Sequence, residues 1–167
     1  MPLIILSFFL PLNGGCKLSN AVLAEKVASV LRNQLAEMKE GKNELLNKYF
    51  PELSSERNKA EELFTSYQEE ITRLLKKTDK TEKFQVPFVT IDSEVEIEDL
   101  ADGGEFTYRI VSPSRRSVKN GEISFLSPVG RSLLLRKPGD EVEVQAPGGT
   151  FRYRIKKVRL REDILQK

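Results

Sequence analysis

Residues 45–60 read LLNKYFPELSSERNKA and predict a sharp reversal between two helices. Pro51 ends the first helix, because proline lacks the amide donor and forces Phe50 out of helical geometry. Either Ser54 or Ser55 can cap a second helix, and Glu56 suits the first turn of that helix. About four residues therefore join two helices, which is typical of an antiparallel helical hairpin.

The sequence on either side of this reversal carries heptad patterns of apolar residues. Residues 20–50 follow 4-3-4 spacing with Lys42 at one expected apolar position, and Ser19 or Asn20 can cap this helix. About thirty residues at ~1.5 Å each predict a rod of roughly 45 Å. Because no third or fourth helix of similar length follows, we expect a hairpin over residues 20–78 that protrudes, rather than half of a four-helix bundle. The seam residues are Ala24, Ala28, Leu31, Leu35, Met38, Leu45 and Tyr49, then Ala60, Phe64, Tyr67, Ile71 and Leu74.

After a polar linker at residues 79–86, the period of the apolar residues changes from that of a helix to that of a strand. Glycine pairs between the alternating runs mark turns. Residues 128–135 read as a short helix, with Ser127 as its cap and a proline at its first position. These patterns predict an antiparallel β-sheet domain with a short helix over residues 87–163, and an α+β chain as a whole. The alternating runs are Val89/Ile91, Val95/Ile97, Phe106/Tyr108/Ile110, Val142/Val144 and Phe151/Tyr153/Ile155.

The net charge of +2 is too small to indicate nucleic-acid binding by itself, but the charges are unevenly distributed. Residues 84–113 carry seven acids and one base, whereas residues 114–167 carry six acids and thirteen bases. Three acids share the outward face of one predicted strand and three bases share that of another. They pair across neighbouring strands, or the basic strand contacts nucleic acid; both interpretations stay open. The two sets are Glu94, Glu96 and Glu98, and Arg152, Arg154 and Lys156.

Candidates for independent chemistry are few in this sequence. There is no histidine, which removes the commonest general base and the commonest zinc ligand. Cys16 is the single cysteine, so an internal disulfide is excluded and the thiol has no histidine to activate it. No phosphate-binding loop occurs, because the glycine pairs lie in predicted hairpin turns. We therefore expect a protein that is not itself an enzyme.

The first 19 residues contain an apolar run that is too short to span a bilayer. No lysine or arginine precedes the run, as a signal peptide would require. We expect an additional N-terminal segment on a cytoplasmic protein. The alternative is an exported lipoprotein anchored at Cys16.

Residues 122–149 read EISFLSPVGRSLLLRKPGDEVEVQAPGG and closely resemble the C-terminal signature of the bacterial Gre transcript-cleavage factors, the GreA/GreB family. In that family a strand ends in Ser-Pro, a short helix follows, and then come Lys-x-Gly-Asp-Glu-Val and a Pro-Gly-Gly turn. The likeness covers roughly residues 84–160 by motif. Residues 20–78 add a helical hairpin of the expected length in the expected place.

The resemblance implies an FKBP-like C-terminal domain that docks at the rim of the secondary channel of RNA polymerase, while the hairpin reaches the active centre. Ser127 and Pro128 map onto the family's docking loop. The protein would be a monomer that meets nucleic acid only within the transcription complex and does not associate with a membrane. At the tip, the residues expected to contact the partner are Phe50, Pro51, Glu52 and Leu53.

Gre cleavage factors also carry an Asp and a Glu three residues apart at the tip, which help to hold the second Mg²⁺ of the polymerase active site. If Glu52 takes the first place here, the second falls on Ser55, which is neutral, and Glu56 is four residues away. The candidate metal ligands, acting in trans, are therefore Glu52 and Glu56. The resemblance predicts a factor that modulates elongation and transcript cleavage; the alternative is a Gre-like regulator or interaction protein that occupies the channel without cleaving and inhibits transcription.

Overall fold

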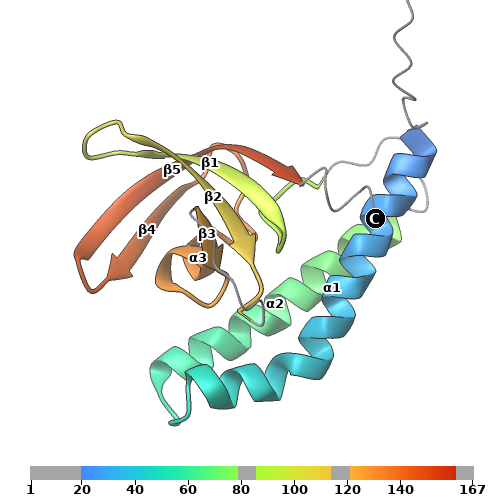
Figure 1. The fold of residues 1–167 in the computed structure, drawn as a ribbon, viewed down its shortest axis with the longest axis horizontal. Helices are drawn as coiled ribbons and strands as arrows, with labels where there is room; N and C mark the ends of the chain where they lie inside the picture. The colour runs from blue at the N-terminus through green and yellow to red at the C-terminus, as the bar shows by residue number, and fades with distance from the viewer. Residues whose placement is uncertain (1–19, 79–85, 114–120, 161–167) are drawn as a thin grey trace, which may run out of the picture.

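The structure is a computed structural model that describes residues 20–78, 86–113 and 121–160 (Figure 1). Two long helices come first, followed by a five-stranded sheet with a short helix between its third and fourth strands in the sequence. The α+β class predicted from the sequence is confirmed. The predictions about the N-terminal segment, the cap at Ser19 and most of the linker lie outside the described residues.

The helical hairpin consists of α1 (Asn20–Tyr49) and α2 (Ser55–Thr78). The two helices are joined by residues 50–54, so the predicted position of the tip is confirmed. The Ser54 hydroxyl accepts a hydrogen bond from the Arg57 amide at 3.2 Å and thereby caps α2.

Burial along the hairpin follows the predicted seams with one exception. Every predicted position of α2 is buried, and so is every predicted apolar position of α1 except Tyr49, whose side chain is 43% exposed. The expectation for Tyr49 was wrong, because this last residue of α1 turns toward the C-terminal domain, where its hydroxyl donates to the Pro113 carbonyl at 3.4 Å. Gln34 is buried although it is polar.

The sheet has the strand order β3-β2-β1-β5-β4. It is a mixed sheet, whereas the sequence predicted an antiparallel one. The short strand β3 runs parallel to β2, whereas the other three pairings are antiparallel. The prediction of a strand at Val89 and Ile91 was also wrong, because this stretch is a loop. The Val89 amide donates to the Arg136 carbonyl and its carbonyl accepts from the Leu135 amide, each at 2.8 Å. The strands are β1 (Ser93–Asp99), β2 (Glu105–Val111), β3 (Glu122–Ser124), β4 (Glu141–Ala146) and β5 (Gly149–Leu160).

The short helix α3 (Pro128–Leu133) lies against the concave side of the curled sheet (Figure 1). It ends two residues before the predicted position, and Leu135 has a φ of 67°, which no α-helix accommodates. The predicted cap at Ser127 is confirmed, because its hydroxyl accepts from the Gly130 amide at 3.0 Å.

The hairpin does not protrude from the C-terminal domain, contrary to the prediction. The sheet and α3 lie along it, so that buried side chains of both parts form one continuous core (Figure 1). Phe64 of α2 meets Phe125 edge-on, with ring centroids 5.6 Å apart. The sequence pattern could not reveal this, because a heptad seam accounts for contacts between the two helices and not for a third partner.

Three residues form a buried polar relay across this interface. Gln34 on α1 donates to the Ile91 carbonyl at 2.8 Å, and Tyr67 on α2 donates to the Gln34 side-chain oxygen at 2.7 Å. The Ile91 amide in turn donates to the Tyr67 hydroxyl at 3.1 Å. Burial raises the pKa of Tyr67, so its phenol stays protonated and keeps its role as a donor.

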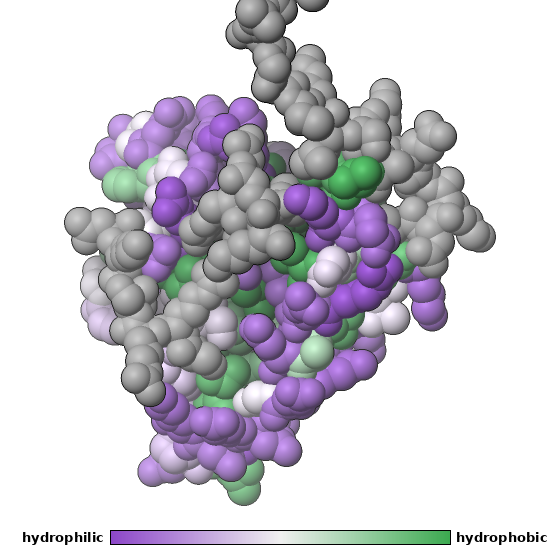
Figure 2. Space-filling view, turned by 45° about the vertical axis from the view of Figure 1, so that its right-hand side comes forward, coloured by the Kyte–Doolittle hydropathy of each residue, from purple (hydrophilic) through white to green (hydrophobic). Residues whose placement is uncertain are grey.

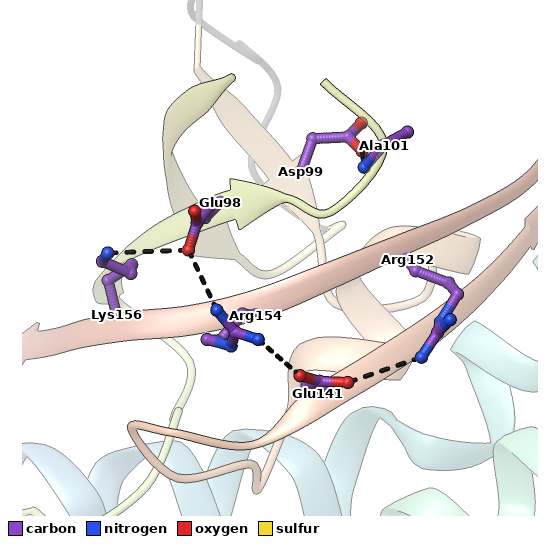
Figure 3. Close-up of polar contacts among 7 residues, drawn as sticks. All are labelled: Glu98, Asp99, Ala101, Glu141, Arg152, Arg154 and Lys156. Atoms are coloured by element: carbon purple, nitrogen blue, oxygen red, sulfur yellow. Dashed lines mark hydrogen bonds and ion pairs between the residues drawn. The ribbon is translucent and has the colours of Figure 1, made fainter. Parts of the chain in front are cut away.

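The charged strands pair with each other on the outer face of the sheet, which decides between the two interpretations of the acidic and basic sets. Arg154 contacts Glu98 at 3.5 Å and Glu141 at 2.8 Å, and Glu141 also meets Arg152 (Figure 3). Lys156 lies 3.5 Å from Glu98. These bases are exposed but engaged by carboxylates, so the structure favours cross-strand pairing over a free basic surface.

On the face of the molecule that Figure 2 shows, most of the described residues are hydrophilic, with apolar residues visible between them. Within residues 20–78, 86–113 and 121–160, no helix is long and apolar enough to cross a membrane.

Candidate functional site

The hairpin tip is organised by Arg57, a residue that the sequence analysis did not single out. Its guanidinium donates to the Phe50 carbonyl at 2.6 Å, to the Asn47 side-chain oxygen at 3.0 Å and to Glu61 at 3.2 Å. One side chain thus ties the end of α1, the loop and the start of α2 together. An arginine one turn after a predicted cap is the only signal that could have indicated this role.

The loop presents its middle residues to solvent. Pro51, Glu52 and Leu53 are all exposed, and the Leu53 side chain reaches 94% exposure. A single exposed leucine is ordinary on a protein surface, but its burial against a partner would remove apolar area from water and so favour binding. Three of the four tip residues proposed for partner binding are therefore accessible.

Phe50, the fourth tip residue, is half-buried and contacts the C-terminal domain. The Arg131 guanidinium of α3 lies 5.5 Å from the centroid of its ring, within the range of a cation–π interaction. Phe50 therefore differs from its three neighbours, because it already has an intramolecular partner.

The carboxylate of Glu56 is engaged by two cations. One oxygen accepts from Lys59 at 3.0 Å, and the other lies 2.8 Å from an Arg131 nitrogen. The hydrogen bonds from Lys59 and then from Arg131 lower the pKa of Glu56. The structure thus pairs Glu56 with bases rather than directing it toward Glu52.

The described residues offer no cluster of ligands that could hold a metal ion without a partner. Among those residues, no group of three or more His, Cys, Asp or Glu side chains could hold an ion. Glu52 and Glu56 alone would offer too few oxygen ligands for Mg²⁺, which prefers six.

The Ser127–Pro128 loop is rigidly built. The Ser127 hydroxyl donates to the Ser124 carbonyl at 2.8 Å while it caps α3, and Pro128 occupies the first helical position. Gly130 permits this geometry, because an added Cβ would lie only 2.1 Å from the Ser124 carbonyl oxygen. Sequence reasoning missed Gly130, since the need for a glycine arises from the approach of α3 to β3.

A groove between α2 and α3 brings the loop and the start of α2 together. Its walls include Glu56 and Lys59 on one side, and Pro128, Arg131 and Glu143 on the other. The loop proposed for docking and the acid proposed at the tip are therefore neighbours in this fold.

Comparisons with known proteins agree with the motif in the C-terminal half. Residues 84–160 match the family described as "Transcription elongation factor, GreA/GreB, C-term". A transcription elongation factor GreA of Methylococcus capsulatus is 46% identical over 71 residues, which are 42% of this chain and 45% of that protein. A second GreA, of Thermosipho melanesiensis, is 38% identical over 86 residues, or 52% and 55% of the two chains. This chain spans about half the length of the curated relatives it matches.

Two solved structures are also similar. A prokaryotic transcription elongation factor GreA/GreB from Nitrosomonas europaea is 31% identical, with 53% of this chain and 78% of that chain covered and a TM-score of 0.39. Gfh1 of Thermus aquaticus is 25% identical, with 81% and 91% covered and a TM-score of 0.41.

Proposed function

Because this chain belongs, through residues 84–160, to the GreA/GreB family of transcription elongation factors, we propose that it binds bacterial RNA polymerase and modulates elongation. The C-terminal domain provides the docking surface, and the hairpin tip provides the part that acts on the polymerase. The observation that carries this proposal is the Gre-like signature, with its capped Ser127–Pro128 loop next to an exposed tip.

Transcript cleavage is the less supported half of this function. Both oxygens of Glu56 are held by cations, and position 55 is a serine. Glu52 is then the single tip acid without a cation contact that the structure records. These observations favour the second candidate function, a Gre-like regulator that occupies the channel without stimulating cleavage. The Mg²⁺ and the hydrolytic chemistry would belong to the polymerase in either case.

Channel insertion requires a change in the contacts at the tip. Arg131, three residues beyond the proposed docking position Pro128, contacts both Glu56 and Phe50. A narrow channel that admits the tip while the C-terminal domain stays at its rim would separate these groups. The Glu56–Arg131 pair therefore has to open when the factor acts. Its side chains are 47% and 19% exposed, so water can replace part of the lost contact.

The docking proposal is tested by retention on immobilised core polymerase. Pro128→Glu changes the loop but keeps the fold, because an acid suits the first turn of a helix. We expect it to weaken retention, whereas Thr107→Glu, at an exposed position on the outer face of β2 and away from the groove between α2 and α3, should bind like the parent. Equal retention of both variants would remove the loop from the docking surface.

Cleavage is tested on backtracked transcription complexes. We expect weak or absent stimulation by the parent chain. Ser55→Glu should raise cleavage, since it restores the acidic spacing at an exposed first-turn position, while Ser55→Gln serves as the uncharged control. Strong cleavage by the parent that Glu56→Gln abolishes would instead assign Glu56 the role of a ligand.

A further inference from the structure

Two phenylalanines on the concave face of the sheet remain exposed at the ends of its two hairpins. Phe106 is 43% exposed and Phe151 is 36% exposed. Phe106 lies opposite Ile97 and Phe151 lies opposite Val144, and both of these partners are fully buried. Because residues directly opposite in an antiparallel pair share a face, both rings lie on the core-facing side of the sheet, beyond the part that the helices cover.

Each phenylalanine is stacked on a tyrosine two residues further along its strand. The Phe106 and Tyr108 rings lie 6.2 Å apart at an angle of 6°, and those of Phe151 and Tyr153 lie 6.3 Å apart at 7°. We call these four residues the aromatic shelf. The turns at its ends are both at the left of Figure 1.

A glycine stands beside each exposed ring. A Cβ added at Gly104 would lie 3.4 Å from the Phe106 ring, and one added at Gly148 would lie 3.6 Å from the Phe151 ring. Any larger residue at these turns would cover part of a ring. The same arrangement occurs at both hairpin ends, and it leaves the phenylalanines accessible at the turns.

The charge beside the shelf is negative. Asp99 is directly opposite Tyr153, and Asp102 follows in the β1–β2 turn. Burial raises the pKa of Tyr153, and Tyr108, Asp99 and Asp102 raise it further. The neighbouring bases of β5 point to the other face of the sheet, where carboxylates engage them (Figure 3).

We propose that the aromatic shelf binds an extended, arginine- or lysine-bearing segment of a protein partner. Guanidinium and ammonium groups are attracted to the faces of aromatic rings, and the two aspartates add a favourable field for the same cations. The aspartates also repel phosphate, so the shelf does not suit nucleic acid. The proposal goes beyond polymerase docking and does not depend on it, because the shelf contains neither the Ser127–Pro128 loop nor the hairpin tip.

The test uses the full isotope-labelled chain and an acetylated, amidated peptide of alternating glycine and arginine. We expect the peptide to shift the amide signals of the shelf strands, and the same peptide with citrulline in place of arginine to bind far more weakly. Phe106→Ala and Phe151→Ala should each reduce affinity about two- to five-fold, the usual size of an exposed cation–π contact. Thr107→Ala, on the outer face of the same strand, is the matched control and should leave affinity unchanged.

The aspartates are tested by isosteric changes. Asp99→Asn and Asp102→Asn keep the side-chain oxygens that accept hydrogen bonds from the Ala101 and Gly104 amides, so the turn stays intact while the charge is lost. Both should weaken arginine-peptide binding. Three results would each overturn the proposal. The citrulline peptide could bind as tightly as the arginine peptide, the variant with both Phe106→Ala and Phe151→Ala could keep full affinity, or the signal shifts could be confined to other surfaces. Self-association of the free chain through the shelf, seen in sedimentation velocity and lost in that double variant, would also overturn it by making a second copy the occupant.

Discussion

Replacing Tyr67 by phenylalanine should destabilise the whole molecule, because its hydroxyl links the hairpin to the C-terminal domain. The side chain is fully buried, and the change removes only one oxygen without altering the ring that packs in the core. In the parent, this oxygen donates to the Gln34 side chain and accepts from the Ile91 amide. The variant leaves an acceptor and a donor unsatisfied in the interior.

The size of the effect follows from those two groups. A buried polar group that loses its partner costs about 1–3 kcal/mol, so two groups should lower the free energy of unfolding by roughly 2–6 kcal/mol. In a chain of this length, each kcal/mol lowers the melting temperature by about 2–4 °C. We therefore expect a melting temperature about 4–24 °C below that of the parent.

Urea and thermal unfolding measure this loss, and Tyr49→Phe is the matched control. The same atom is removed there, but the side chain is 43% exposed and its hydrogen bond is long, at 3.4 Å. We expect the control to unfold within about 0.5 kcal/mol of the parent. Amide exchange at Ile91 should also become faster in Tyr67→Phe. If the two variants were equally stable, the relay would contribute nothing and the argument for domain packing through it would be wrong.

The remaining predictions concern two glycines and the charged groups around Glu56. Gly130→Ala should lower the free energy of unfolding by about 3 kcal/mol or more, since its Cβ would meet a backbone carbonyl oxygen at 2.1 Å. Gly41→Ala, where the nearest atom would be 3.9 Å away in mid-helix, should instead raise it by about 0.5–1 kcal/mol; chemical denaturation measures both. Lys59→Ala and Arg131→Ala should each raise the lowered pKa of Glu56, as followed by carboxyl NMR titration. The pKa of Glu56 is lower in the folded than in the unfolded chain, so Glu56 stabilises the fold above its unfolded pKa, and this contribution is lost as the pH falls through its folded pKa. Glu56→Gln should therefore reduce the loss of stability that occurs on acidification through this range.

Much of the local structure follows from the sequence alone. Pro51 and the two seams predict the hairpin and its tip, because helix formation and termination depend on residues within one or two turns. Alternation at Val95/Ile97 and Val142/Val144 predicts the strands, and Ser127 with Pro128 predicts the start of α3. The Gre-like signature at residues 122–149 likewise depends on the order of residues and on nothing distant.

Only the tertiary structure decides which distant segments meet. Gln34 interrupts no heptad and gives no sign of being buried, yet it lies between α2 and the loop at Ile91. Arg131 is an ordinary basic residue in its own helix, and its contacts with Glu56 and Phe50 arise because the C-terminal domain folds back along the hairpin. The parallel pairing of β3 has the same origin. The hydrogen bonds of a helix close within four residues and so can be read locally, whereas contacts between far segments depend on how all the buried faces of the chain are covered at once.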